Sequence, residues 1–260
     1  MGGRHKRSPT LCNGILRARR RVDADASGRA TLAGDTTMSF VEYADDEMLA
    51  MGLVGVLAGD LRKALRNQDR VLFVVPGGTT PGPIFDGLCA VDLDWDRVDI
   101  LLSDERWRPE VHVRSNTRLI REHLLKDRAA AARYLPLYAK AEEPESVLAE
   151  LEANIAPALP IDVCLLGMGA DMHTASLFPG ADRLEEALER NAPILVPMRA
   201  PGLDEPRVTL SARVLDGALS KHVVITGAQK RAAFERAQHM RPLEAPIAAV
   251  LAGTTIHWSP

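Results

Sequence analysis

Short runs of consecutive apolar residues alternate along this chain with segments whose apolar residues recur at helical spacing. The clearest run, VLFVV at 71–75, is typical of a strand buried on both faces of a sheet. Alternation of such strands with helices predicts an α/β fold with a largely parallel sheet flanked by helices. The expected strands are 71–75, 98–102, 161–166, 193–197, 207–210 and 222–226, and residues 247–251 are expected to close the sheet.

Capping residues indicate where the intervening helices begin. Asp45 or Asp46 can cap a helix that runs to about residue 67, and Ser115 can cap one that runs to about residue 125. Further helices are expected at 142–156 and 228–238. In open α/β sheets ligands bind beyond the carboxyl ends of the strands, so the residues that follow each strand are the candidates for a functional site.

The composition excludes several classes of protein. Of 260 residues, 46% are hydrophobic and 26% charged, which argues against collagen-like, disordered and disulfide-scaffold proteins. No apolar run approaches the roughly 20 residues that a membrane helix needs. Cys12, Cys89 and Cys164 are odd in number and form no C-x-x-C pair. We therefore expect reduced thiols in a cytoplasmic protein that has no zinc ribbon.

Charge divides the chain into two parts. Residues 1–37 hold eight Lys or Arg and three Asp, a net charge of +5, whereas the remainder is net −8. Since residues 1–37 also lack periodicity, we expect a disordered basic extension. It could be an arm for nucleic acid or an anionic surface, a transit peptide, or, as we favour, an extension without function. Residues 38–260 are expected to form a single domain, whose acidic charge argues against nucleic-acid binding.

A glycine-rich turn, PGGTTP at 76–81, follows the first expected strand. Gly77 and Gly78 let backbone N–H groups approach an anion, and Thr79 and Thr80 add hydroxyl donors. Pro81 suits the first turn of the next helix, whose positive end faces the same place. The turn is as consistent with a phosphate-binding loop as with an ordinary turn, and it lacks the pattern of a nucleotide P-loop.

Charged residues follow the second expected strand, in the sequence SDERW at 103–107. Arg106 could hold a phosphate through two hydrogen bonds. Asp104 or Glu105 could hold sugar hydroxyls or move protons. The alternative is a solvated charged turn with Trp107 packed over it, and we favour the functional interpretation.

The stretch GMGADMHTASLFPG at 167–180 is the most informative in the chain. It presents Asp171 and His173 two residues apart, directly after a buried strand. A histidine in a loop can act as a general base near neutral pH, and an adjacent carboxylate can set its tautomer. Asp104 with Asp171 and His173 could in principle bind a metal. We expect no metal site, because only one histidine is well placed and no H-x-x-x-H spacing exists.

Two cations, Arg207 and Lys230, lie near the ends of later strands. Each is a candidate phosphate ligand, although a single cation of this kind is more often a solvated surface charge. The chain has no G-x-S-x-G motif and no G-x-G-x-x-G after a strand. These absences argue against a serine hydrolase and a dinucleotide-binding protein.

Taken in order, these motifs resemble those of the 6-phosphogluconolactonase family. Met172 departs from the resemblance, since it stands where the family usually has Gly. The matching elements within residues 38–260 are PGGTTP at 76–81 (S-G-G-S-T-P in the family), DERW at 104–107, Ser115-Asn116, the stretch 167–180 (G-x-G-x-D-G-H-T-A-S-L-F-P-G), RVTL at 207–210 and G-x-x-K at 227–230.

The resemblance implies a fold similar to that of glucosamine-6-phosphate deaminases, ribose-5-phosphate isomerases and CoA-transferases. That fold is a modified Rossmann-like α/β domain with a small additional sheet near the C-terminus. The activity implied is hydrolysis of 6-phospho-D-glucono-1,5-lactone to 6-phospho-D-gluconate in the oxidative pentose phosphate pathway, without a cofactor.

The resemblance also implies roles for individual residues. His173 would be the base that activates water, Asp171 would orient it, and Asp104 would hold hydroxyls or stabilise the imidazolium. Backbone N–H groups near 167–169 would stabilise the oxyanion. The residues implied to bind substrate are Gly77, Gly78, Thr79, Thr80, Arg106, Asn116, Arg207 and Lys230.

Two other functions stay open. A glucosamine-6-phosphate deaminase would carry a further acid after the histidine and D-E-Y in place of DERW, so both differences favour the lactonase. A non-catalytic sugar-phosphate sensor would need a DNA-binding domain, and residues 1–37 are too short and irregular for a helix-turn-helix. We expect a small sugar-phosphate lactone as partner, neither nucleic acid nor membrane, and a monomer or small homo-oligomer.

Overall fold

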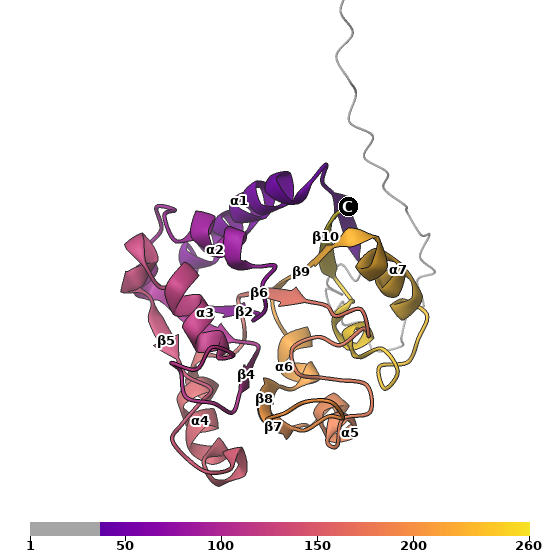
Figure 1. The fold of residues 1–260 in the computed structure, drawn as a ribbon. Helices are drawn as coiled ribbons and strands as arrows, with labels where there is room; N and C mark the ends of the chain where they lie inside the picture. The colour runs from indigo at the N-terminus through magenta and orange to yellow at the C-terminus, as the bar shows by residue number, and fades with distance from the viewer. Residues whose placement is uncertain (1–36) are drawn as a thin grey trace, which may run out of the picture. The chain divides into compact units, whose positions relative to one another are not determined.

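The computed structural model describes residues 37–260, so the extension expected at 1–37 lies outside the described residues apart from Thr37. A seven-stranded sheet has the order β1-β10-β9-β6-β2-β3-β5, and a three-stranded sheet has the order β4-β8-β7 (Figure 1). All neighbours in the larger sheet are parallel, and those in the smaller sheet are antiparallel. The predicted α/β class, with a largely parallel sheet and a small additional one, is confirmed.

The strands of the larger sheet are largely withdrawn from solvent. Every residue of β2 and β3 is buried. The sequence of β2 is apolar throughout and that of β3 is interrupted only by Asp99, which is typical of strands covered on both faces. The larger sheet consists of β1 (Ser39–Glu42), β2 (Val71–Val75), β3 (Val98–Leu102), β5 (Arg133–Leu135), β6 (Val163–Gly167), β9 (Ser220–Thr226) and β10 (Thr254–Ser259). The smaller sheet consists of β4 (Asp104–Arg106), β7 (Leu195–Met198) and β8 (Arg207–Leu210).

The expected capping residues begin two of the helices. Asp45 accepts a hydrogen bond from the backbone N of Met48 at 2.8 Å, and Ser115 accepts one from the backbone N of Arg118 at 3.3 Å. The α-helices are α1 (Asp46–Leu65), α2 (Gly82–Leu88), α3 (Asn116–His123), α4 (Leu148–Ile155), α5 (Leu184–Leu188), α6 (Ala212–Asp216) and α7 (Gly227–Ala237). The 3₁₀ helices are η1 (Trp95–Arg97), η2 (Asp127–Ala131), η3 (Pro144–Ser146), η4 (Ala156–Ala158) and η5 (Pro246–Val250).

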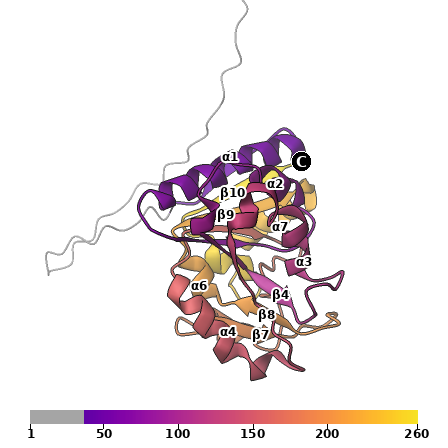
Figure 2. The same ribbon diagram turned by 90° about the vertical axis from the view of Figure 1, so that its left-hand side faces the viewer.

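Helices cover both faces of the larger sheet. α1 packs against α2, and α2 packs against α3. The connections through these three helices run the same way across the sheet, so right-handed crossovers place them on one face. The chain then returns from β5 to β6 and β9, which places α4 and α6 on the other face. Figure 2 shows α1 and α2 on one side of β9 and β10, with α4 and α6 on the other.

The direction of winding reverses between β2 and β6. These two strands pair through only two residue pairs, Phe73–Val163 and Val74–Cys164. The loops that leave their carboxyl ends therefore run apart, and a crevice at such a switch point is where ligands bind in open α/β sheets.

The expectation that residues 247–251 close the sheet is wrong. They belong largely to η5, which begins at Pro246, a residue that cannot donate to a strand ladder and suits the start of a helical turn. The strand that pairs with β9 on the side away from β6 is β10. Its sequence, TTIHWS, mixes apolar with polar residues, so it contains no continuous apolar run. The edge strand β1 was not expected either, because it is short and mostly exposed.

Two of the three cysteines fall in the described part of the chain. Cys89 and Cys164 are free and buried, as the expectation of reduced thiols requires, and Cys12 lies outside the described residues. Burial raises the pKa of the Cys164 thiol to about 12. Within residues 37–260, no helix is both long enough and apolar enough to cross a membrane.

Candidate active site

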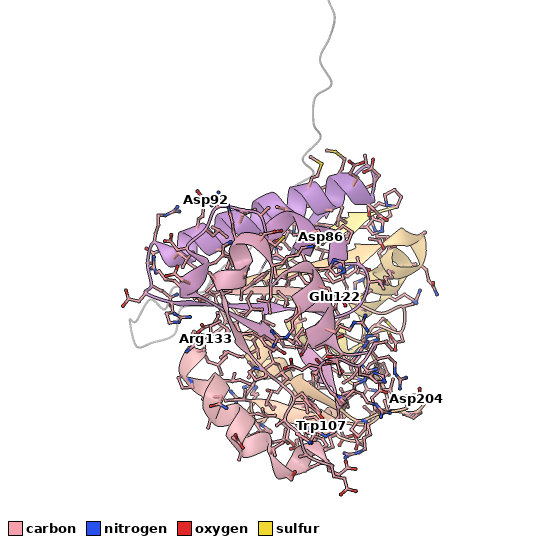
Figure 3. All side chains as sticks on the ribbon, turned by 60° about the vertical axis from the view of Figure 1, so that its left-hand side comes forward. Asp86, Asp92, Trp107, Glu122, Arg133 and Asp204 are labelled. Atoms are coloured by element: carbon pink, nitrogen blue, oxygen red, sulfur yellow. The ribbon has the colours of Figure 1, made fainter. Side chains whose placement is uncertain are left out.

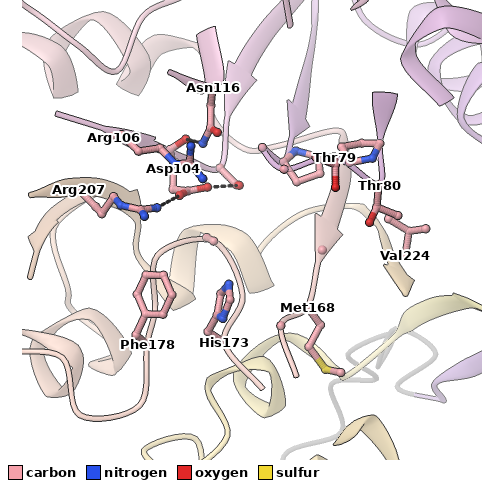
Figure 4. Close-up of a pocket in the computed structure, with 18 of the residues that line it drawn as sticks. Thr79, Thr80, Asp104, Arg106, Asn116, Met168, His173, Phe178, Arg207 and Val224 are labelled. Atoms are coloured by element: carbon pink, nitrogen blue, oxygen red, sulfur yellow. Dashed lines mark hydrogen bonds and ion pairs between the residues drawn. The ribbon is translucent and has the colours of Figure 1, made fainter. Parts of the chain in front are cut away.

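A cavity of about 250 Å³ lies where β2, β3, β6 and β9 reach their carboxyl ends (Figure 4). Ten of the eleven site residues predicted from the sequence line it. The exception is Asp171, which contacts His173 from outside the lining. The ten are Gly77, Gly78, Thr79, Thr80, Asp104, Arg106, Asn116, His173, Arg207 and Lys230.

The two glycines of the 76–81 loop meet different requirements. A Cβ atom on Gly77 would lie 2.1 Å from Oδ1 of Asn116, so only glycine lets α3 approach the loop this closely. Gly78 has a φ of +88°, in the left-handed region that favours glycine. Thr79 and Thr80 follow and line the cavity (Figure 4). The loop therefore contributes small, uncharged, hydroxyl-bearing groups to one wall.

The carboxylate of Asp104, at the start of β4, is held from several sides. Its Oδ2 accepts a hydrogen bond from Ser176 Oγ at 2.6 Å, and its Oδ1 accepts one from Ser103 Oγ at 3.1 Å. Nη1 of Arg207 lies 3.8 Å from the same Oδ2 atom (Figure 4). Asp104 is therefore a buried anion that orients Arg207 at the edge of the cavity.

Arg106 and Arg207 are cross-strand partners in β4 and β8, so their side chains reach the cavity together. Nη1 of Arg106 donates to the carbonyl O of Arg114. The Nε atoms of Arg106 and Arg207 are buried and have no hydrogen-bond partner within residues 37–260. Burial lowers the pKa of the Arg207 guanidinium, because a cation withdrawn from water is less stable. A bound anion would supply the hydrogen-bond acceptors that these two Nε atoms lack.

Glu105 does not face the cavity, so of the two acids that the sequence offered for holding hydroxyls or moving protons, only Asp104 lines it. It is fully buried, and both oxygens of its carboxylate accept hydrogen bonds from the start of α3. Burial raises the pKa of this carboxyl, although the hydrogen bonds oppose that effect. Trp107 is buried too, and its ring centroid lies 4.9 Å from that of Tyr138. Trp107 is labelled near the bottom of the molecule in Figure 3. The SDERW stretch therefore contains the strand β4 and is not a solvated turn.

His173 reaches the cavity from a tight turn after β6. The backbone N of Gly169 donates to the carbonyl O of His173 at 3.0 Å, and the backbone N of Met172 donates to the carbonyl O of Gly169 at 3.0 Å. A Cβ atom on Gly169 would lie 2.3 Å from the His173 ring, so glycine is required there. The turn holds the histidine through its own backbone hydrogen bonds.

The carboxylate of Asp171 sets the tautomer of His173. Nδ1 of His173 lies 2.5 Å from Oδ1 of Asp171, and a hydrogen bond donated by Nδ1–H leaves the lone pair on Nε2. The same hydrogen bond holds the pKa of Asp171 below its usual range, so Asp171 stays ionised near neutral pH. This is the arrangement of a general base and the group that orients it.

Met172, which departs from the resemblance noted above, keeps the backbone that glycine would provide. Its φ is +68°, in the left-handed region that glycine adopts without strain. Its carbonyl O accepts a hydrogen bond from the backbone N of Ile247 at 3.1 Å, and its side chain packs against the hydrophobic core. The substitution therefore leaves the Asp171–His173 pair in place.

Phe178 is a cavity residue that the sequence did not single out. Its ring centroid lies 4.3 Å from that of His173, and Cζ of Arg207 lies 5.7 Å from it (Figure 4). Phe178 therefore separates the histidine from the cation and supports the imidazole ring. In the sequence, only the motif at 167–180 could have pointed to Phe178, because an aromatic residue in a loop is usually interpreted as part of the core. Other lining residues that the sequence did not single out are Ser103, Met168, Ala175 and Val224.

Lys230 lies in the first turn of α7 and lines the cavity. Within the described chain, no carboxylate lies within ion-pair distance of it. It therefore adds an unneutralised positive charge to those of Arg106 and Arg207. In residues 37–260 no group of three or more His, Cys, Asp or Glu is arranged to hold a metal ion.

The fold and the cavity together define a class: an α/β protein with a small cationic pocket and a histidine–carboxylate pair at the carboxyl ends of a parallel sheet. A family model described as "Glucosamine-6-phosphate isomerases/6-phosphogluconolactonase" matches residues 44–258. The chain belongs to this family.

Several relatives of this chain are named 6-phosphogluconolactonase, which is one of the two names in that description. A 6-phosphogluconolactonase of Pseudomonas aeruginosa is 42% identical over 219 residues, which are 81% of this chain and 90% of the relative. One of Mesorhizobium japonicum is 39% identical and covers 84% of this chain and 94% of its own. The crystal structure of a 6-phosphogluconolactonase from Shewanella baltica superimposes with a TM-score of 0.82 at 31% identity, over 87% of this chain and 99% of that one.

Proposed function

We propose that this protein hydrolyses 6-phospho-D-glucono-1,5-lactone to 6-phospho-D-gluconate, the lactonase step of the oxidative pentose phosphate pathway. The observation that carries the proposal is the His173–Asp171 pair at a cavity that three cations also line. The 6-phosphogluconolactonases among its relatives support the same reaction. The cytoplasmic location and the monomeric or small homo-oligomeric state remain predictions from the sequence.

His173 begins the reaction by removing a proton from water. The water oxygen then bonds to C1 of the lactone, and the charge that develops on the carbonyl oxygen needs donors, for which backbone N–H groups near 167–169 are the candidates. The bond from C1 to the ring oxygen breaks, and the imidazolium returns its proton to that oxygen. Asp171 stays ionised throughout and stabilises the imidazolium.

The cations hold the phosphate and so position the ring. Arg106, Arg207 and Lys230 carry the charge that a phosphate needs, and Thr79 and Thr80 add hydroxyl donors. Asp104 orients Arg207 through their ion pair and is available to sugar hydroxyls. Fixing the phosphate away from the carbonyl presents the ester to His173 in one orientation, which is a large part of rate acceleration.

The test is formation of 6-phosphogluconate from freshly made lactone, followed through a coupled dehydrogenase beside an enzyme-free blank. We expect His173→Ala to lose about 100-fold or more of the wild-type rate above the blank, because a general base contributes that much. His239→Ala, which removes an exposed histidine, is the matched control and should behave as wild type.

The outcomes separate the remaining alternatives. A wild-type rate equal to the blank would contradict the lactonase proposal. In that case, release of ammonia from glucosamine-6-phosphate would indicate a deaminase, and binding of 6-phosphogluconate without turnover would indicate a sensor. Acceleration that survived His173→Ala would keep the reaction and assign the base to another residue.

A further inference from the structure

Glu105 is a buried carboxylate whose hydrogen bonds tie β4 to the first turn of α3. Its Oε1 accepts hydrogen bonds from the backbone N of Arg106 at 2.7 Å and of Asn116 at 2.8 Å. Its Oε2 accepts them from Ser115 Oγ at 3.0 Å and from both N and Oγ1 of Thr117 at 2.7 Å. The residue is 0% exposed, so this carboxylate contacts no substrate.

The groups that Glu105 joins are those that line one wall of the cavity. Side chains alternate along a strand, so Asp104 and Arg106 point away from Glu105 and towards the cavity. Nδ2 of Asn116 donates to the carbonyl O of Asp104 at 2.9 Å, which closes a second link between α3 and β4. Asn116 in turn lies against Gly77 of the opposite loop.

We propose that Glu105 is a positioning residue for substrate binding. It fixes the positions of Asp104, Arg106 and Asn116, and it takes no part in the chemical step. The inference rests on the proposed function and adds to it a residue outside the cavity. Arg207 is affected as well, because it pairs with Arg106 across β4 and β8.

The base lies on a turn that Glu105 does not contact, and the hydrogen bond from Ser176 Oγ to Asp104 Oδ2 is the side-chain link from that stretch to β4. His173 is held by the backbone hydrogen bonds of its own turn and by Asp171. Loosening β4 and α3 should therefore weaken contacts that bind the substrate in the ground state and the transition state alike. Loss of such uniform binding raises KM and leaves kcat nearly unchanged.

Glu105→Gln is the sharpest substitution because it keeps the shape of the side chain. Every position around the carboxylate is a donor, so the amide NH2 group must face at least one backbone N–H group. Hydroxyl groups of Ser115 and Thr117 can turn to accept a hydrogen bond, but backbone amides cannot. The start of α3 must therefore move.

The matched control is Asp99→Asn, which alters a buried carboxylate at the amino end of β3, outside the cavity lining. Asp99 pairs with Arg70 and Arg133, so its loss should lower stability without touching the site. We expect Glu105→Gln to raise KM for 6-phosphogluconolactone roughly tenfold or more, with kcat within about twofold of wild type. The Kd for 6-phosphogluconate, measured by calorimetry, should rise in parallel. Asp99→Asn should lower Tm and leave KM, kcat and Kd unchanged.

Each result decides the proposal. Unchanged KM and Kd in Glu105→Gln would overturn it, and so would a fall in kcat at constant KM, which indicates fewer folded molecules.

If Glu105→Gln does not fold, Ser115→Ala decides, since it removes one donor to Oε2: raised KM supports the proposal and unchanged KM overturns it. If wild type binds 6-phosphogluconate without turnover, the proposed function fails and Kd alone tests Glu105. If it does neither, both proposals are overturned.

Discussion

At the scale of single residues, His257 shows how burial controls a titratable group. The Tyr43 hydroxyl lies 2.9 Å from Nδ1 of His257, and Nε2 of His257 lies 3.0 Å from Nδ1 of His222. Nε2 of His222 lies 2.9 Å from Oδ2 of Asp60 on α1. His257 is 1% exposed and His222 is 4% exposed. Burial, together with the neighbouring His222, lowers the pKa of His257 to about 3.

This pKa makes stability depend on pH. A histidine of the unfolded chain titrates near 6.5, so between about pH 3 and 6.5 the unfolded chain binds more protons than the native protein. The contribution of His257 is therefore complete above pH 6.5 and is lost as the pH falls towards 3. We expect His257→Gln to make the fall in unfolding free energy between pH 6.5 and 4.5 shallower, by up to about 1.4 kcal/mol per pH unit. Urea denaturation at stepped pH measures it, and equal slopes in the two proteins would contradict it.

Single residues also show which parts of the site could be predicted from the sequence. His173, Asp171 and Arg106 could be predicted because each follows a recognisable buried strand and carries a group with obvious chemistry. Glu105 carries similar chemistry, and only the structure shows that its side chain points to the opposite side of β4. Phe178 could not be predicted, since its place between the histidine and Arg207 depends on tertiary contacts.

At the scale of elements, α1 contains three glycines whose surroundings differ. A Cβ atom on Gly55 or Gly59 would meet no atom within 4 Å, whereas one on Gly52 would lie 2.4 Å from Cε1 of Tyr43. Glycine in a helix interior costs stability because it loses more conformational freedom on folding than alanine does.

We expect Gly55→Ala and Gly59→Ala each to raise the free energy of unfolding by about 0.5–1 kcal/mol. Gly52→Ala should lower it, since the Tyr43 ring must move and its hydrogen bond to His257 is disturbed. Urea denaturation of the three variants at pH 7 is the measurement. A Gly55→Ala variant that is less stable than wild type would contradict the expectation, because it would show that the added methyl group meets other atoms in solution.

A strand could be predicted from the sequence where its buried residues form a clear apolar run. β2 is an uninterrupted apolar run, β6 is apolar up to its final glycine, and β3 is interrupted only by Asp99, so their burial on both faces could be inferred directly. β10 mixes threonine, histidine and serine with its apolar residues, because the Tyr43–His257–His222 hydrogen bonds satisfy polar groups inside the sheet. The apolar run that precedes β10 forms η5 instead.

At the scale of the whole molecule, positive charge is concentrated in one cavity of an acidic protein. Residues 38–260 carry a net charge of −8, yet Arg106, Arg207 and Lys230 line one cavity at the carboxyl edge of the sheet. The buried carboxylates of Asp104 and Glu205 lie within ion-pair distance of Arg207. A cavity of this kind attracts small anions locally while the rest of the surface repels them. The charge distribution therefore favours a phosphorylated substrate over its neutral analogue.

The most direct test of the account compares two lactones in the same assay. Wild-type protein is given 6-phosphoglucono-1,5-lactone and unphosphorylated glucono-1,5-lactone, and kcat/KM is measured for each above its enzyme-free blank. We predict hydrolysis of the phosphorylated lactone with kcat/KM at least about 100-fold higher, because the cations that position it have no partner on the neutral sugar. Equal values for the two lactones, or no acceleration of either, would contradict the account.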